Sequence, residues 1–185
     1  MTEPLFDERG WTSGIVEAVD PDDAVALFLP VAALRLHSFE LMNAARSLGF
    51  ALTISPEKHY PSGTIPLADL AVFELRAVTE GSDSMRARVR VVPRERASRV
   101  VDAALDTALL AGGQGMDGLV KRSRLVVQID DATSDACALL VAALFARAHL
   151  GPIRLPNRVG EPPHIGLFGL KGARERLAAY GVNVE

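Results

Sequence analysis

The run Ser123-Arg-Leu-Val-Val-Gln-Ile129, the turn Asp130-Asp-Ala-Thr133 and the segment 134–150 decide the fold of this 185-residue chain. The run is short, apolar and rich in β-branched residues, which is typical of a buried strand. The segment after the turn is rich in alanine and leucine and carries no charge between Asp135 and Arg147. That pattern predicts a long buried helix. We therefore expect a central strand leading into a central helix, with the remaining chain packed around this pair.

Outward from this pair, apolar periodicity and turn residues divide the chain into further elements. Strands are predicted over 14–19, 50–54, 67–79, 85–93 and 164–170, and helices over 31–48 or from Ser38, 95–111 and 171–180. Residues 24–29 fit a strand or one helical turn, and 112–118 read as a flexible break. This order predicts an α+β fold, with a mixed, mostly antiparallel sheet and helices on one face. An arrangement of two ferredoxin-like halves is an alternative.

Length bounds the number of domains. A chain of 185 residues suits one domain, which buries roughly 70% of its unfolded surface and needs no disulfide or metal to fold. We expect a loose N-terminal arm over residues 1–14 and a single α+β domain over 15–185, with pseudo-halves at 15–80 and 85–185 as a subdivision.

Composition excludes several classes of protein. The net charge of −3 argues against nucleic acid as a partner. The single cysteine, Cys137, permits no intrachain disulfide, and the spacing of the histidines does not indicate a metal site. The first residues are acidic and polar, unlike a signal peptide. The longest apolar run, 136–146, is about half of the ~20 residues that span a membrane. We expect a cytoplasmic protein that does not enter the membrane.

Asp130 and Asp131 are candidate ligand-binding residues, because they lie where the central strand gives way to its helix. With Asp135 they present oxygen atoms of the kind that bind Mg²⁺, but the sequence does not locate a further ligand. The structural alternative is that these aspartates cap the helix and complement its dipole.

A glycine-rich segment followed by basic residues is a second candidate site, because backbone N–H groups in such turns bind anions. The candidate ligand-binding residues are Gly112, Gly113, Gln114, Gly115, Lys121 and Arg122. The segment follows a predicted helix and precedes a strand, the reverse of the known phosphate-binding motifs. The alternative interpretation is a helix end followed by a loop.

Arg86, Arg88 and Arg90 alternate with apolar residues and so point to one face of their strand. They are the best candidate in the chain for a nucleic-acid or polyanion-binding surface. The acidic composition instead favours a solvated face, or salt bridges to Glu74 and Glu80 on the partner strand, and after these a subunit interface with acidic partners.

Three functions remain open at this stage. The first is a non-catalytic module that binds a small molecule or an anion, or that has a regulatory role, and that acts as a homo-oligomer. The second is a structural protein that assembles into a symmetric homo-oligomer. The third is an enzyme that uses Asp130 and Asp131 with His59 or His164. The oligomer is expected because the chain is strongly aliphatic and its short strands need cover at their edges. The sequence identifies no cofactor.

Overall fold

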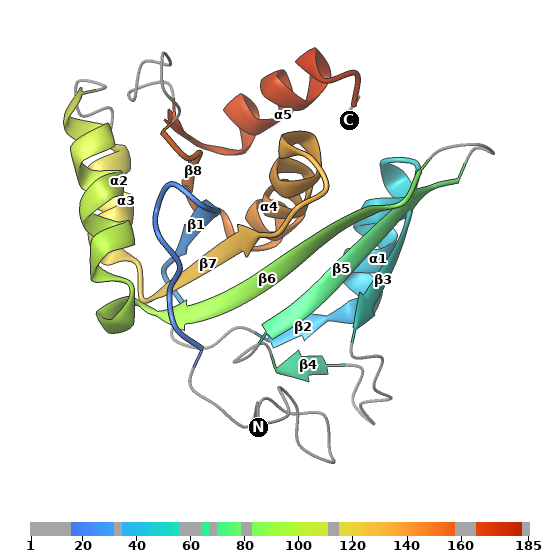
Figure 1. Ribbon diagram of the computed structural model, residues 1–185, viewed down its shortest axis with the longest axis horizontal. Coiled ribbons are helices and arrows are strands. Elements are labelled where there is room, and N and C mark those ends of the chain that lie inside the picture. Colours follow the sequence, from blue (N-terminus) through green and yellow to red (C-terminus); the bar gives the residue numbers. More distant parts are fainter. Residues whose placement is uncertain are drawn as a thin grey trace.

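The structure is a computed structural model and describes residues 16–31, 35–55, 64–66, 70–78, 83–110, 115–157 and 166–182. Its strands are β1 (Val25–Leu29), β2 (Arg35–His37), β3 (Phe50–Ser55), β4 (Thr64–Pro66), β5 (Leu70–Ala77), β6 (Met85–Pro93), β7 (Leu125–Asp130), β8 (Ile153–Arg154) and β9 (Leu167–Phe168). Seven of them form one antiparallel sheet in the order β3-β5-β6-β7-β1-β8-β9, and β2 pairs with β4 (Figure 1).

The helices are α1 (Ser38–Ser47), α2 (Ser98–Leu110), α3 (Met116–Arg122), α4 (Asp135–His149) and α5 (Leu170–Ala179), with a 3-10 turn η1 (Arg94–Arg96) before α2. The predicted antiparallel α+β fold is confirmed as a single domain. One continuous sheet runs through both predicted pseudo-halves, and ferredoxin-like halves are not confirmed. The predicted arm, residues 1–14, lies outside the described residues.

The predicted central pair is confirmed. β7 is buried from Leu125 to Ile129, and α4 is buried at every position from Cys137 to Ala146. Because α4 is apolar on all sides, it must be covered by the sheet and by other helices. It packs on β1, β6 and β7, with α5 and α1 as neighbours. Phe145 of α4 stacks on Phe73 of β5 with ring centroids 5.5 Å apart.

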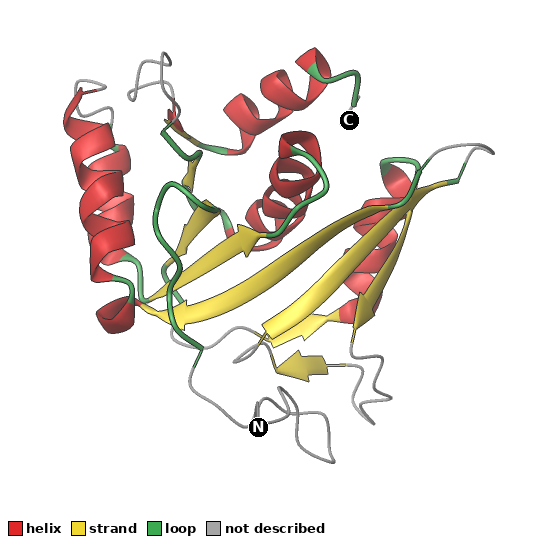
Figure 2. Cartoon of the chain, viewed as in Figure 1, coloured by secondary structure: helices red, strands yellow, loops and turns green. Residues whose placement is uncertain are grey.

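Two apolar clusters lie on opposite faces of the sheet, because successive side chains of a strand alternate between faces. Val25, Leu27 and Leu29 of β1 join the cluster that contains α1, α4 and α5. Ala26 and Phe28 point the other way, into the cluster formed with α2 and α3. Figure 2 shows α2 and α3 side by side at one end of the sheet. Helices thus cover both faces, whereas the sequence predicts cover on one face.

Two further elements differ from the predictions. Residues 112–118 do not form one continuous break, because α3 begins at Met116, after Gly115 in the left-handed region at φ 79°. Residues 16–19, the described part of the predicted 14–19 strand, form no strand. Instead, the fully buried Gln128 amide accepts from Val19 N–H and donates to Val19 O, both at 3.0 Å. The alternative start of α1 at Ser38 is confirmed.

Candidate functional site

The antiparallel register of β6 and β7 places the arginines of β6 beside the aspartates at the end of β7. Arg88 lies opposite Asp130, and Arg90 lies opposite Gln128. Ala87, Val89 and Val91 point into the core, so the alternate arginines must share the opposite face. Two candidate features that are about 40 residues apart in the sequence therefore form one site.

Asp130 is the most enclosed charge in this arrangement. Its Oδ2 accepts from Arg90 Nε at 3.1 Å and Nη2 at 3.0 Å, and lies 3.8 Å from Arg88 Nη1. The Asp130 side chain is 11% exposed and that of Arg90 is 18% exposed. A partly buried pair in this geometry is held by charge-assisted hydrogen bonds. Asp130 therefore orients the face of β6 that carries Arg86, Arg88 and Arg90, which we call the arginine face.

The turn from β7 to α4 holds Asp131 and Thr133 against β6. Asp131 has φ 48°, a left-handed conformation that aspartate tolerates better than most residues. Its carboxylate accepts from Arg88 Nη2 at 2.9 Å. Thr133 N–H donates to Arg86 O at 2.8 Å, and Thr133 Oγ1 accepts from Arg86 N–H at 2.9 Å. Thr133 thus fixes the turn to the strand that carries the arginines.

The cap of α4 is Ser134, whose Oγ accepts from Cys137 N–H at 3.1 Å. The capping interpretation of Asp130 and Asp131 is therefore wrong. Both aspartates lie too early in the chain to reach the first free N–H groups of the helix, and arginines take up their carboxylates instead.

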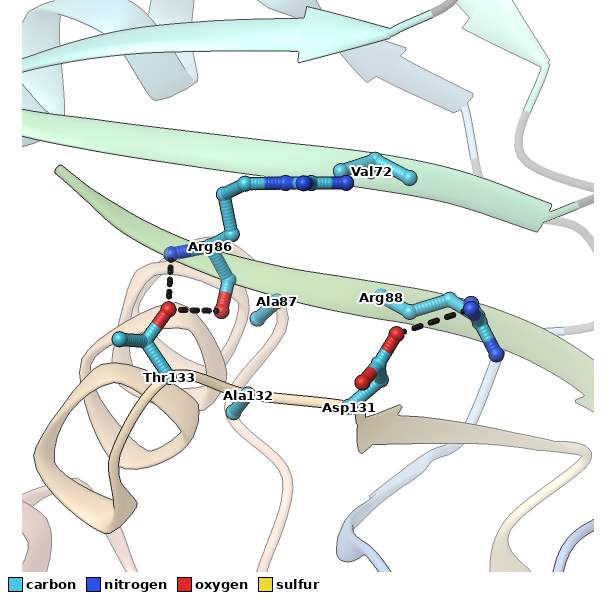
Figure 3. A pocket seen from close by; sticks show the side chains of 7 residues that line it. All are labelled: Val72, Arg86, Ala87, Arg88, Asp131, Ala132 and Thr133. Carbon is cyan, nitrogen blue, oxygen red and sulfur yellow. Dashed lines mark hydrogen bonds and ion pairs between the residues drawn. The ribbon is translucent and has the colours of Figure 1, made fainter.

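Arg86 borders a hollow of about 250 Å³ (Figure 3). The hollow is lined by Val72, Arg86, Ala87, Arg88, Asp131, Ala132 and Thr133. In Figure 3 the Arg86 side chain extends along Val72 of β5. Among the described residues, no carboxylate pairs with its guanidinium. The hollow therefore carries two guanidinium groups and one carboxylate, a net positive charge on its wall.

A second hollow, of about 550 Å³, shares the turn residues Asp131, Ala132 and Thr133 with the first. Its wall is acidic, with Asp22, Asp23, Asp130, Asp131 and Asp135. Within the part of the chain that the structure describes, no three His, Cys, Asp or Glu side chains are grouped to hold a metal ion.

Asp22 of this second hollow is held by the neighbouring strand β8. The fully buried Arg154 donates from Nη2 to Asp22 Oδ1 at 3.0 Å, and Asn157 N–H donates to the same oxygen at 3.0 Å. Burial alone would raise the pKa of Asp22, but these hydrogen bonds outweigh it and keep the pKa below its ordinary value. One carboxylate of the acidic hollow, that of Asp22, is thus already paired with a buried arginine.

The structure does not bring the two predicted ligand-binding groups together. Gly112, Gly113 and Gln114 lie outside the described residues, and Gly115 precedes α3. Lys121 pairs with Asp117 at 3.0 Å, and Arg122 Nε donates to Gly118 O at 3.1 Å. Lys121 and Arg122 precede β7, whereas Asp130 ends it and Asp131 follows it, so the two groups are separated by the length of the strand, roughly 17 Å.

The expected salt bridges from the arginine face to β5 are absent among the described residues. Glu74 lies opposite Arg86 but pairs with Arg76 of its own strand at 2.8 Å. Glu80 lies outside the described residues, as do His59 and His164, the histidines of the enzyme hypothesis. The alternation of arginines along 86–90 identified Arg86 and Arg88 as a candidate polyanion-binding surface, but sequence reasoning did not join them to Asp130 and Asp131 in one site, and it missed Thr133.

Cys137 is fully buried in α4, and burial raises the pKa of its thiol to about 11. Because the thiolate is the reactive form, we expect the native protein to resist thiol reagents at mildly alkaline pH and to react on unfolding. Labelling with a chromogenic disulfide, with and without denaturant, measures this. Equal rates in both conditions would contradict a buried, structural cysteine.

Comparison with protein-family models, curated proteins and solved structures finds no match to this chain. No helix in the described ranges is both long enough and apolar enough to cross a membrane.

Proposed function

We propose that the protein is a non-catalytic, cytoplasmic binding module for a small anionic ligand, and that it acts as a homo-oligomer. The observation that carries the proposal is the Arg86 guanidinium, which borders a hollow beside Arg88 and has no carboxylate partner among the described residues. A guanidinium fork suits carboxylate and phosphate groups, which it binds through paired hydrogen bonds.

The size of the hollow limits the ligand. At about 250 Å³ it lies just below the usual range of ligand pockets, roughly 300–1,000 Å³. A phosphate monoester or a small dicarboxylate fits this space better than a nucleotide. The Thr133 hydroxyl lies on the same wall, although its hydrogen bonds to Arg86 already occupy it in part.

Asp131 acts as a resident anion in this proposal. Its carboxylate accepts from Arg88 at 2.9 Å, yet the Asp131 side chain is 68% exposed. An exposed ion pair of this kind contributes roughly 1 kcal/mol or less, so an incoming anion displaces it at small cost. Arg90 and Asp130 remain paired behind it and hold the site in shape.

The first test is Arg86→Gln. Inorganic phosphate and malonate, each compared with chloride at equal ionic strength, should raise the thermal unfolding midpoint of the unmodified chain, because a ligand that binds only the folded state stabilises it. We expect Arg86→Gln to lose most of this gain while keeping the starting midpoint, since the Arg86 side chain is exposed and its backbone bonds to Thr133 do not change.

The matched control is Arg147→Gln, which removes an exposed arginine in the last turn of α4. Phosphate also stabilises proteins in general by exclusion from their surface, and that part of the gain is common to all variants. Only the difference between Arg86→Gln and Arg147→Gln reports the site. An equal gain in the two variants would place anion binding elsewhere and overturn the proposal.

A further inference from the structure

The seven-stranded sheet ends in two unlike edges. β9 is a two-residue strand, whereas β3 at the other end has six residues. In the described part of the chain, β5 is the only strand that pairs with β3, so no described strand occupies the outer edge of β3. Long free edges are the places where a further strand can add to a sheet.

The hydrogen bonds on the inner side of β3 identify which residues face outward. Val78 N–H donates to Gly49 O at 2.9 Å, and hydrogen-bonded positions alternate along an antiparallel pair. Ala51, Thr53 and Ser55 therefore bond to β5. The N–H and C=O groups of the intervening residues point to the free edge; these are Phe50, Leu52 and Ile54.

These outward residues are symmetric about Leu52. When two copies of β3 meet in antiparallel orientation with Leu52 opposite Leu52, Phe50 of each copy lies opposite Ile54 of the other. Every outward N–H and C=O group then meets a partner, because each outward-facing residue of one copy lies opposite an outward-facing residue of the other. A twofold axis generates this pairing, and a twofold dimer is the commonest symmetric assembly.

The side chains of β3 do not oppose such a pairing. The strand Phe-Ala-Leu-Thr-Ile-Ser has no charge and no proline, the features that usually protect an edge. On the open face Ala51 of one copy would lie beside Thr53 of the other, so no like charges meet. On the core face Leu52 and Ile54 are covered by α1, which packs inward against α4.

We propose that two copies of this chain pair through their β3 edges and form one continuous sheet. This inference specifies the interface of the homo-oligomer in the proposed function. The twofold axis runs perpendicular to the sheet, so the arginine faces of both copies lie on the same side. A dimer formed in this way presents two anion hollows on one surface.

The test is a pair of charge variants at two exposed positions, Ala51 and Thr53. In A51K/T53K, the lysine introduced at position 51 of each copy faces the lysine introduced at position 53 of the other. In A51E/T53K, a glutamate at position 51 faces that lysine instead. The glutamate also lies beside Arg76 of its own chain, and the lysine lies beside Glu74. Both variants contain T53K, so the effect of this one lysine on the arginine face is common to them.

We expect the unmodified chain to be a dimer at micromolar concentration by sedimentation velocity. Two like-charge contacts should weaken A51K/T53K dimerisation by about tenfold or more, and A51E/T53K should restore the dimer. Hydrogen exchange gives a second readout: the N–H groups of Leu52 and Ile54 should exchange more slowly as concentration rises. Thermal melts at low concentration check that both variants fold.

A monomeric unmodified chain at these concentrations would overturn the proposal, as would an A51K/T53K dimer as tight as the original. Failure of the anion site is distinguishable from failure of the interface. Arg86→Gln should leave the sedimentation of the dimer unchanged, and A51E/T53K should keep its stabilisation by phosphate and malonate.

Discussion

Gly151→Ala is expected to lower the free energy of unfolding by about 3 kcal/mol or more, the upper end of the usual cost of overpacking. A Cβ atom at this position would lie 2.2 Å from Phe28 O and 2.9 Å from Leu29 Cδ2. The first of these is a backbone atom of β1, an interior strand of the sheet, so it cannot rotate away as a side chain would.

The backbone around Gly151 cannot easily move to relieve the clash of an added Cβ with Phe28 O. Phe28 N–H donates to Pro152 O at 3.1 Å, which fixes the connection from α4 to β8 against β1. Any shift that relieves the clash must move this connection and weaken its bond to β1. Urea unfolding of the variant and the unmodified chain, at equal protein concentration, measures the loss.

Gly118→Ala is the matched control, because it makes the same chemical change inside α3. There the nearest atom to the added Cβ is the flexible Arg122 Nη2 at 4.0 Å. Alanine should stabilise this helix by about 0.5–1 kcal/mol, because glycine loses more backbone freedom on folding. A Gly151→Ala variant as stable as Gly118→Ala would contradict the close packing of the α4–β8 connection on β1.

The elements with strong local patterns were predictable. The apolar run 123–129 and the uncharged segment after Asp135 correspond to β7 and α4, and the alternating arginines correspond to β6. The length and composition of the two apolar runs are sufficient for β7 and α4, and the alternation of apolar and charged residues is sufficient for β6. The hairpin of β5 and β6 follows for the same reason.

The elements that were missed depend on contacts between distant residues. α3 has only seven residues and follows glycines, so its own sequence reads as a break, and packing against α2 stabilises it. The partners of Arg88 and Arg90 were sought on β5 because β5 precedes β6 in the chain. The strand order places β7 on the other side of β6, and local sequence does not specify that order.

The candidate site shows the same limit. Asp130 and Asp131 are recognisable from sequence as residues at the end of a strand, but their roles differ in a way that only the register reveals. One carboxylate is enclosed by Arg90, and the other is exposed beside Arg88. We therefore expect substitution of Asp130 to lower stability and substitution of the adjacent Asp131 to leave stability almost unchanged.

Asp130→Asn should lower the free energy of unfolding by about 2 kcal/mol, because it weakens a charged hydrogen-bonded pair and leaves the Arg90 guanidinium without a counter-charge. The Arg90 side chain is only 18% exposed, so water replaces the lost interaction poorly. Asp131→Asn should change stability by roughly 0.5 kcal/mol or less, since the Asp131 side chain is 68% exposed and asparagine also tolerates its left-handed backbone.

A double-mutant cycle measures the interaction energy between Asp130 and Arg90 apart from the contacts that each makes with other residues. Asp130→Asn combined with Arg90→Gln should cost less than the sum of the two single changes by about 1 kcal/mol, because the residues contact each other directly. Additive effects in urea unfolding would sink the interpretation of Asp130 as the support of the arginine face.

The same two asparagine variants also distinguish a carboxylate that holds the arginines in place from one that competes with the ligand for an arginine. Asp131→Asn frees the Arg88 guanidinium from its resident carboxylate, so phosphate and malonate should bind the variant more tightly than the unmodified chain. Asp130→Asn should weaken anion binding, since Arg88 and Arg90 lose the charge that orients them. Calorimetric titration below the unfolding temperature of both variants measures the two affinities. Weaker binding by Asp131→Asn would mean that Asp131 helps to form the site and does not compete with the ligand.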